Sequence, residues 1–270
     1  MGGHACCDPC DRRIVRSVHI VTRGARLAGV RTETIGVMGT LYLVRHGQAS
    51  FGADDYDRLS ELGHRQCSAL GEALAQRGVR PAAVLRGSLQ RHRQSWDALV
   101  EGWTQAGGAR QARDAAVEPQ EWPGLNEYDS LALLNALGGE PLPSPDSAEG
   151  FKAHFRRLRQ ALLAWMEGRI APLGMPSYGE FQRGVMEVLS HVQAAHAGQP
   201  VLVVSSGGPI STAVAHVLGA PAATAIDLNM RLRNSALTEM VFSAKRLELL
   251  AFNTLPHLEH PVRREWITYA

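Results

Sequence analysis

The stretch TLYLVRHG, residues 40–47, decides the fold of this chain. Its first five residues are aliphatic, aromatic or β-branched, which is typical of a buried strand. Arg45 and His46 follow at the carboxyl end of that strand, where open α/β sheets form their ligand crevices. Taken alone, the Arg-His-Gly triplet favours a structural histidine over a base, a ligand or a nucleophile. We predict a buried strand over 40–44 and keep Arg45 and His46 as the first site candidate.

Outward from this strand, the chain alternates strands with helices. Apolar runs predict further strands over 82–85, 201–204, 236–242 and 247–252, the last two joined by a short polar turn. Apolar residues at helical spacing predict helices that begin near residues 60, 89, 146 and 177. This alternation predicts one α/β layered domain over 38–270, with a mostly parallel central sheet.

Capping signals and apolar faces locate the ends of these helices. The expected caps are Ser60, the capping box Asp146 with Glu149, and the capping box Ser177 with Glu180. The helix from 146 to 168 is expected to bury one apolar face, made of Phe151, Phe155, Leu158, Leu162 and Trp165. The stretch 102–116 is rich in Gly, Ala and Gln, and we expect a loop or a frayed helix end there.

The composition is that of an ordinary soluble protein, with 270 residues, 45% of them hydrophobic, and a net charge of +2. It excludes collagen, coiled coil and chain-wide disorder. Residues 1–37 carry six Arg against three acidic residues, so the excess positive charge lies in this leading segment and not in the rest of the chain. No strong basic surface therefore indicates a nucleic-acid-binding protein. No secretory signal and no clean apolar run of membrane-spanning length is found. We expect a cytoplasmic protein that binds neither nucleic acid nor membrane.

The leading segment 1–37 is predicted to be a disordered extension or an untranslated stretch, with Met38 as the true start. It holds three of the four cysteines, Cys6, Cys7 and Cys10. A solvated tail is favoured over a metal site, because no second Cys or His pair follows at zinc-binding spacing. A reducing compartment is the simpler interpretation of so few cysteines.

Three further segments carry residues that suit chemistry on an anion. Arg91 begins the helix after strand 82–85, where an Arg fork and backbone amides both favour an anion. Glu127 follows a Trp-Pro-Gly turn. A chemical role is expected for it only if it lies beside an anion site, where it can act as a proton donor. Residues 206–208, Ser-Gly-Gly, follow strand 201–204 and offer backbone amides as an anion cradle. The plain alternatives are a solvated helix face for Arg91 and a solvated loop for Glu127.

Taken together and in this order, these motifs resemble the histidine phosphatase superfamily, whose fold is phosphoglycerate mutase-like. The resemblance spans essentially all of 38–270 and rests on residues 41–48, 59–63, 87–91, 125–127, 203–208 and 234–236. It implies a three-layer α/β/α sandwich with a mostly parallel central sheet. It also implies a metal-independent phosphomonoester hydrolase that acts on a small-molecule phosphate ester and needs no cofactor.

By that resemblance, His46 is the nucleophile that accepts the phosphoryl group, Arg45 and Arg91 bind its oxygens, and Glu127 is the general acid. The resemblance also implies a set of substrate-binding residues, Gly47, Gln48, Ser206 and Gly207. Elementary chemistry agrees, since a neutral imidazole is a competent nucleophile near pH 7. A loose phosphoryl transition state spreads negative charge that two guanidinium groups can neutralise, so no metal is expected.

Ser206 is a departure, because it stands where the family has a second histidine. That histidine is a donor aimed at the phosphoryl oxygens, and removing one such donor typically costs about 10²–10³ in rate. Ser206 keeps a hydroxyl, so phosphate binding is expected to survive. His92 is expected to point elsewhere on its helix, yet it or a histidine of the run His257 to His260 is a candidate substitute. That pair of histidines is otherwise expected to be solvated.

Two alternatives to a phosphatase stay open. Ser206 favours a non-catalytic or weakly active relative that binds a phosphorylated ligand. A true phosphoglycerate mutase ranks third, because the segment after Gly47 lacks the Trp- and Asn-containing stretch that mutases usually show. The region between Glu127 and Ser177 is also short for their insertion. The sequence predicts neither the physiological substrate nor the oligomeric state.

An acidic segment lies between the first strand and the first helix. Asp54, Asp55 and Asp57 resemble half a calcium loop, but no Glu follows at the twelfth position. We expect a solvated loop near the mouth of the site that disfavours highly anionic substrates.

Overall fold

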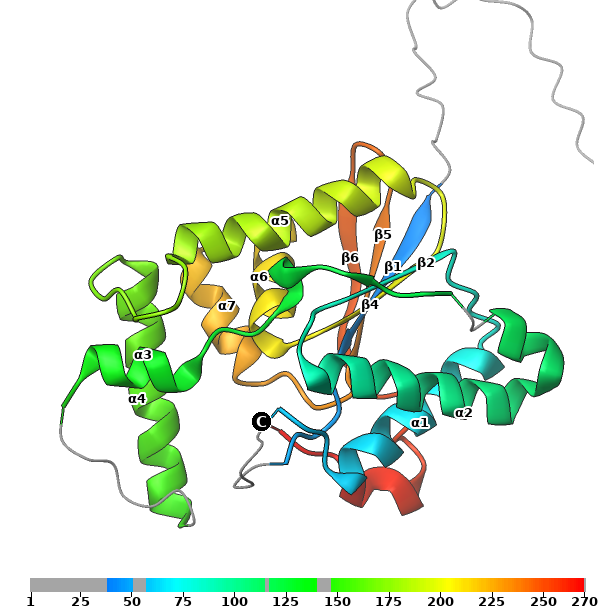
Figure 1. Ribbon diagram of the computed structural model, residues 1–270, viewed down its shortest axis with the longest axis horizontal. Coiled ribbons are helices and arrows are strands. Elements are labelled where there is room, and N and C mark those ends of the chain that lie inside the picture. The colour runs from blue at the N-terminus through cyan, green and yellow to red at the C-terminus, as the bar shows by residue number, and fades with distance from the viewer. Residues whose placement is uncertain (1–37, 51–56, 115–116, 140–146, 270) are drawn as a thin grey trace, which may run out of the picture. The chain divides into compact units, whose positions relative to one another are not determined.

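A six-stranded sheet with the order β3-β2-β4-β1-β5-β6 forms the centre of the fold (Figure 1). The structure is a computed structural model that describes residues 38–50, 57–114, 117–139 and 147–269. The strands are β1 (Gly39–Arg45), β2 (Ala83–Arg86), β3 (Gln120–Glu121), β4 (Val201–Ser205), β5 (Leu237–Phe242) and β6 (Leu247–Thr254). The first four strands run parallel, and β5 pairs antiparallel with both of its neighbours. The predicted α/β fold with a mostly parallel sheet is confirmed.

Side chains alternate between the two faces of the sheet, as the pleat of a strand requires. In β1, Leu41 and Leu43 join one buried apolar cluster, whereas Val44 joins a second cluster together with Leu202 and Val204 of β4. Both faces are therefore apolar, which explains why the central strands are continuous hydrophobic runs in the sequence.

Helices cover both faces of the sheet (Figure 1). The Val44 face packs on α1 (Glu61–Gln76) and α2 (Gln90–Asp114), and the Leu41 face packs on α5 (Tyr178–Ala195) and α6 (Gly207–Val217). Three further helices, α3 (Ser130–Leu137), α4 (Ala148–Met166) and α7 (Ala222–Asn229), contribute to a third apolar cluster around Trp165. The 3₁₀ helices are η1 (Pro123–Leu125) and η2 (Pro261–Trp266). This is the three-layer sandwich that the resemblance implied.

The helix caps agree with the sequence at two of three places. Ser60 accepts the amide of Gly63, and Ser177 with Glu180 forms the predicted capping box. The capping box at Asp146 and Glu149 is wrong, because Ser147 caps α4 by accepting the amide of Gly150. Asp146 itself lies outside the described residues, as do the predicted extension 1–37 and its cysteines. Asp and Ser are both good cap residues, so sequence pattern alone does not show which of the adjacent residues Asp146 and Ser147 caps the helix.

Two other predictions concern helices. For the stretch 102–116 a loop and a helix end are both predicted; the loop is wrong, because residues 102–114 form the end of α2, and residues 115–116 lie outside the described residues. A Cβ on Gly102 would lie 1.8 Å from the carbonyl oxygen of Ser68, so the glycine lets α2 pack closely on α1. Tertiary packing thus overrides the low helix propensity of glycine. Phe151 was expected inside but is 44% exposed, because it lies in the first turn of α4, ahead of the buried part of that helix.

A glycine pair fixes the turn after β1 against the start of α1. A Cβ on Gly63 would lie 2.2 Å from the carbonyl oxygen of Gln48, and a Cβ on Gly47 would lie 2.4 Å from the carbonyl oxygen of Gly63. Both neighbours are backbone atoms, which cannot move aside as a flexible side chain can. The turn at residues 45–48 therefore has one position relative to α1.

We predict that Gly63→Ala lowers the free energy of unfolding by about 1–3 kcal/mol, because the added methyl group overlaps backbone. Gly179→Ala is the matched control, since a Cβ at this exposed helical glycine meets nothing within 4 Å. The control is expected to be neutral or to stabilise by less than about 1 kcal/mol. Urea titrations of both variants measure the difference, and an equal effect of the two substitutions would contradict the close approach.

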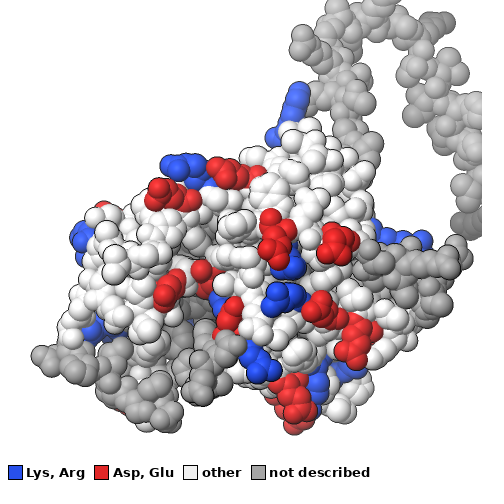
Figure 2. Space-filling model, viewed as in Figure 1, with Lys and Arg blue, Asp and Glu red and all other residues white. Residues whose placement is uncertain are grey.

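The described surface carries mixed charge. On the face shown in Figure 2, Lys and Arg side chains are interspersed with Asp and Glu among the described residues. Within the described ranges, no helix has the length and apolar character needed to cross a lipid bilayer.

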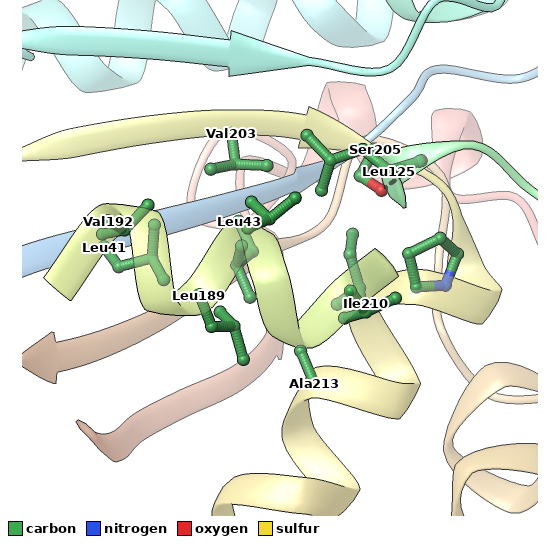
Figure 3. A pocket seen from close by; sticks show the side chains of 12 residues that line it. Leu41, Leu43, Leu125, Leu189, Val192, Val203, Ser205, Ile210 and Ala213 are labelled. Atoms are coloured by element: carbon green, nitrogen blue, oxygen red, sulfur yellow. Dashed lines mark hydrogen bonds between the residues drawn. The ribbon is translucent and has the colours of Figure 1, made fainter. Parts of the chain in front are cut away.

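A small cavity lies between the sheet and helices α5 and α6 (Figure 3). Its lining is aliphatic apart from Ser205, whose hydroxyl donates to the carbonyl of Leu125 at 2.7 Å. A cavity of this kind offers an anion no charged group, so it is a packing feature of the core rather than a candidate site.

Candidate active site

The candidate residues gather at the carboxyl ends of three adjacent strands, β2, β4 and β1. In the parallel register, Arg45 is the partner of Ser205, and Arg86 is the partner of Val204. The segments that leave these strands therefore start at one edge of the sheet. His46, the first turn of α2 and the first turn of α6 meet there, as expected for a crevice in an open α/β sheet.

His46 is almost fully buried and held through both its backbone and its ring. Its amide donates to the carbonyl of Ser205 at 2.9 Å, and its carbonyl accepts the amide of Ser235 at 3.1 Å. Its Nδ1 lies 2.7 Å from the carbonyl oxygen of Gly47. Because a carbonyl can only accept, Nδ1 carries the hydrogen and Nε2 keeps its lone pair.

Burial places the pKa of His46 well below its usual range, and the positive charges of Arg45 and Arg91 lower it further. The imidazole is therefore neutral at physiological pH. Desolvation raises the pKa of Glu127, and the same two charges oppose that rise, so both arginines act on both groups. The four residues predicted from the sequence as catalytic thus share one electrostatic environment.

The two arginines are themselves buried and paired. The guanidinium Nη1 of Arg45 donates to the carbonyl of Leu232. The Nη1 of Arg91 lies 2.6 Å from the Oδ1 of Asp57, whose Oδ2 accepts the amide of Gln90 at 2.7 Å. Asp57 is predicted to lie in a solvated loop near the mouth of the site; it does lie beside Arg91 and its side chain is 32% exposed, but its carboxylate is bound to Arg91 and to the first amide of α2 rather than only to solvent. Asp54 and Asp55 lie outside the described residues.

Glu127 lies against the first turn of α6. Both of its carboxylate oxygens are 3.1 Å from the amide nitrogen of Gly208, and a Cβ on Gly208 would lie 2.2 Å from one of them. Desolvation raises the pKa of Glu127, while the Gly208 amide and the two arginines oppose that rise. The glycine therefore admits a carboxyl group whose proton is retained to a higher pH than usual.

The space around Ser206 is occupied by His92. The Nε2 of His92 lies 2.7 Å from the Oγ of Ser206, and its ring centroid is 5.8 Å from that of His46. Both residues are fully buried. Burial, followed by the charges of Arg91 and Arg86, lowers the pKa of His92 to about 3. The pair is therefore a neutral hydrogen-bonded unit next to His46.

The expectation that His92 points elsewhere is wrong. The helix α2 begins at Gln90, so Arg91 and His92 both lie in its first turn, and that end of the helix faces the site. A Cβ on Gly87 would lie only 2.2 Å from the Nδ1 of His92, so the glycine after β2 makes room for the ring.

The remaining predicted substrate-binding residues form the turn after β1 and the start of α6. The Gly47 amide donates to the Oγ of Ser95 at 3.1 Å, and the Gln48 amide donates to the Oε1 of Gln66 at 2.9 Å. Gly207 begins α6 beside Glu127. Ser95 and Gln66, which accept these two amides, are not predicted from the sequence. The sequence of an amphipathic helix does not show which partner a single polar residue binds.

The C-terminal histidines do not form the expected solvated pair. His257 is buried, its Nε2 lies 2.8 Å from the Oγ of Ser235, and burial lowers its pKa to about 3. His260 is exposed and caps η2. His257 therefore supports the backbone that follows His46 rather than substituting at Ser206. Across the described ranges, no group of three or more His, Cys, Asp or Glu side chains is placed to hold a metal ion.

The sequence profile of the histidine phosphatase superfamily, branch 1, matches residues 41–255. The chain belongs to the histidine phosphatase superfamily. No curated protein sequence matches it. Among solved structures, the chain is similar to mycobacterial hydrolase 1, with 22% identity, a TM-score of 0.56, and coverage of 81% of this chain and 99% of that one.

Two other solved structures to which the chain is similar are named for different activities. A mycobacterial glucosyl-3-phosphoglycerate phosphatase is 20% identical, with a TM-score of 0.53 and coverage of 80% of this chain and 99% of that one. A phosphoglycerate mutase from Bacillus anthracis is 15% identical, with a TM-score of 0.55 and coverage of 82% and 96%. Likeness at this level establishes the shared fold, so the chemistry has to be argued from the site itself.

Proposed function

We propose that this protein is a metal-independent phosphomonoester hydrolase that acts through a phosphohistidine on His46. The hydrogen bond from Nδ1 of His46 to the carbonyl of Gly47 carries the proposal. It leaves Nε2 as a nucleophile in a ring that burial keeps neutral. Arg45 and Arg91 supply the positive charge that a loose phosphoryl transition state needs.

In the first step, Nε2 of His46 attacks phosphorus, so that an N–P bond forms as the ester P–O bond breaks. Glu127 gives its proton to the departing oxygen, which leaves as an alcohol. The raised pKa of Glu127 suits it to this task, because the carboxyl form is then present closer to neutral pH.

In the second step, water attacks the phosphohistidine. The Glu127 carboxylate takes a proton from that water while the O–P bond forms and the N–P bond breaks. Inorganic phosphate leaves, His46 is again a neutral imidazole, and Glu127 is again protonated. Atoms and charge balance without a further reactant.

The pH dependence follows from the two groups. Activity requires neutral His46, so it is lost only as pH falls through the lowered pKa of that ring. Activity also requires protonated Glu127, so it falls as pH rises through the raised pKa of that carboxyl group. We expect a bell-shaped profile displaced toward acid pH.

Glu127→Gln is expected to affect substrates with poor leaving groups most. An alkyl phosphate needs protonation of its leaving oxygen, so its kcat should fall by about 10²–10⁴, whereas p-nitrophenyl phosphate should lose less than about tenfold. Asp129→Asn, at an exposed helix cap two residues away, is the control and should change neither rate. Equal losses for both substrates would contradict the role of Glu127 as general acid.

The proposed function is tested by rapid quenching of the enzyme with a phosphate ester under alkaline conditions, which preserve phosphohistidine. The expected result is one acid-labile phosphoryl group per chain on His46, formed and consumed at rates that match turnover. Turnover without such an intermediate would overturn the proposal.

A phosphate-binding protein without turnover is the second candidate, and the buried Ser206–His92 pair favours it. The hydroxyl of Ser206 is engaged by His92 at 2.7 Å and is fully buried, so a phosphoryl-facing donor typical of the family is missing. This candidate predicts that titration calorimetry detects binding of a phosphate ester that is never hydrolysed. The mutase stays a third possibility, distinguished by interconversion of 2- and 3-phosphoglycerate faster than phosphate release.

A further inference from the structure

The site is less cationic than its two arginines suggest. Asp57 lies 2.6 Å from Arg91 and offsets the charge of that guanidinium. The family's second histidine is replaced by the Ser206–His92 pair, which is neutral because burial lowers the pKa of His92 to about 3. Arg45 is the other buried cation next to His46. This charge is sufficient for one phosphoryl group and leaves little to attract a second anion.

Arg86, the further cation that acts on His92, is paired with Glu121 at 2.7 Å. Three pairs of uncharged side chains also lie next to these groups. Beside Gly47, the Oγ of Ser60 donates to the Oε1 of Gln48 at 2.8 Å. Beside Glu127, the amide of Asn126 donates to the Oγ of Ser88 at 2.8 Å.

A third pair, in which Asn229 donates to the hydroxyl of Tyr128 at 2.6 Å, lies against the first turn of α6. A Cβ on Gly207 would touch Asn229, and a Cβ on Gly208 would touch the ring of Tyr128. Amides and hydroxyls of this kind exchange hydrogen bonds readily with the hydroxyl groups of a substrate.

We propose that the substrate is a phosphomonoester whose leaving group is uncharged and carries hydroxyls, and that the Asp57–Arg91 pair discriminates against a leaving group with a carboxylate or a second phosphate. This inference rests on the proposed function and specifies its substrate class. The Asp57 carboxylate is 32% exposed and is held beside the buried Arg91, so it repels an anionic leaving group more strongly than a charge in bulk water would, although solvent screens part of the effect. Asp57 is thus a specificity-determining residue.

The test compares glycerol phosphate with 3-phosphoglycerate, which share a skeleton and differ by a hydroxymethyl group against a carboxylate. We expect kcat/KM for glycerol phosphate to exceed that for 3-phosphoglycerate by at least about tenfold. Asp57→Asn keeps the shape and the helix cap but removes the charge, and it should narrow this ratio about tenfold. Glu239→Gln is the control, since it breaks another Arg–carboxylate pair, with Arg77, on β5, and should leave the ratio unchanged.

A wild-type preference for 3-phosphoglycerate, or a ratio unchanged by Asp57→Asn, would overturn the inference. Failure of the proposed function looks different, because then neither ester nor p-nitrophenyl phosphate is hydrolysed. In that event, calorimetric titration of the two esters into the wild-type protein gives the binding ratio without turnover, and equal affinities would overturn the inference independently.

Discussion

His46→Ala is expected to abolish hydrolysis of phosphate esters, with a loss of about 10⁴–10⁶ in kcat, the range seen when a covalent nucleophile is removed. The proposed N–P bond cannot form without the imidazole at position 46. Arg45, Arg91 and the glycine amides stay in place, so the variant should still bind a phosphate ester. Steady-state rates with p-nitrophenyl phosphate measure the loss, and calorimetry measures the retained binding.

His64→Ala is the matched control for this experiment, because it removes an exposed histidine from α1 and should leave kcat unchanged. A His46→Ala protein that keeps its activity within tenfold of wild type would exclude His46 as the nucleophile. A variant that unfolds is recognised by its melting curve. His46→Gln then supplies the test, since a glutamine amide can still donate to the carbonyl of Gly47 but has no nucleophilic ring nitrogen.

The sequence predicts the central strands well because their apolar runs have one physical explanation. Strand 201–204 is buried on both faces and wholly apolar, and strand 40–44 differs only at the half-buried Thr40 and Tyr42. The residues that suit a turn follow directly after each strand in the sequence. Once these strands are parallel neighbours, the segments that follow them must start at one edge. His46 and Ser206 could therefore be predicted to approach each other without knowledge of any side-chain position.

The contacts that the sequence could not predict join side chains far apart in the chain. His92 and Ser206 are 114 residues apart and meet only because α2 begins where it does. Asp57 pairs with Arg91 although its neighbours along the chain are those of a polar loop. Gln66 is buried inside α1, where its amide reaches the C-terminal segment through the carbonyl of Trp266 at 2.6 Å. Until the packing of two elements is known, the sequence is equally compatible with each of these polar residues lying on the solvent-exposed surface.

Ser206 alone invites the prediction that Ser206→His restores a missing histidine, and the structure argues against that simple result. Ser206 is fully buried, and its Oγ lies 2.7 Å from the ring of His92. An imidazole at 206 would overlap the ring at 92, and overpacking of this kind typically costs about 1–3 kcal/mol. We therefore expect the single variant to be destabilised and to gain no activity.

Moving the imidazole ring from position 92 to position 206 is expected to raise kcat, whereas Ser206→His alone is not. In the double variant His92→Ala with Ser206→His, volume is roughly conserved and a donor faces the phosphoryl oxygens again. One preorganised donor is worth about 10²–10³ in rate, so we expect kcat to rise by up to about that factor above wild type. The new histidine should also titrate, so that the gain fades as pH rises above its pKa.

His92→Ala alone is the control for the double variant, because it removes the ring without supplying a donor and leaves Ser206 without its partner. It should lose stability, as a buried hydrogen bond and a packed ring are both removed. The coupling between the two positions, read from the four proteins of a double-mutant cycle, should be large and favourable in both stability and kcat. Additive effects, or a Ser206→His protein that is stable and faster on its own, would show that His92 does not occupy the place of the missing histidine.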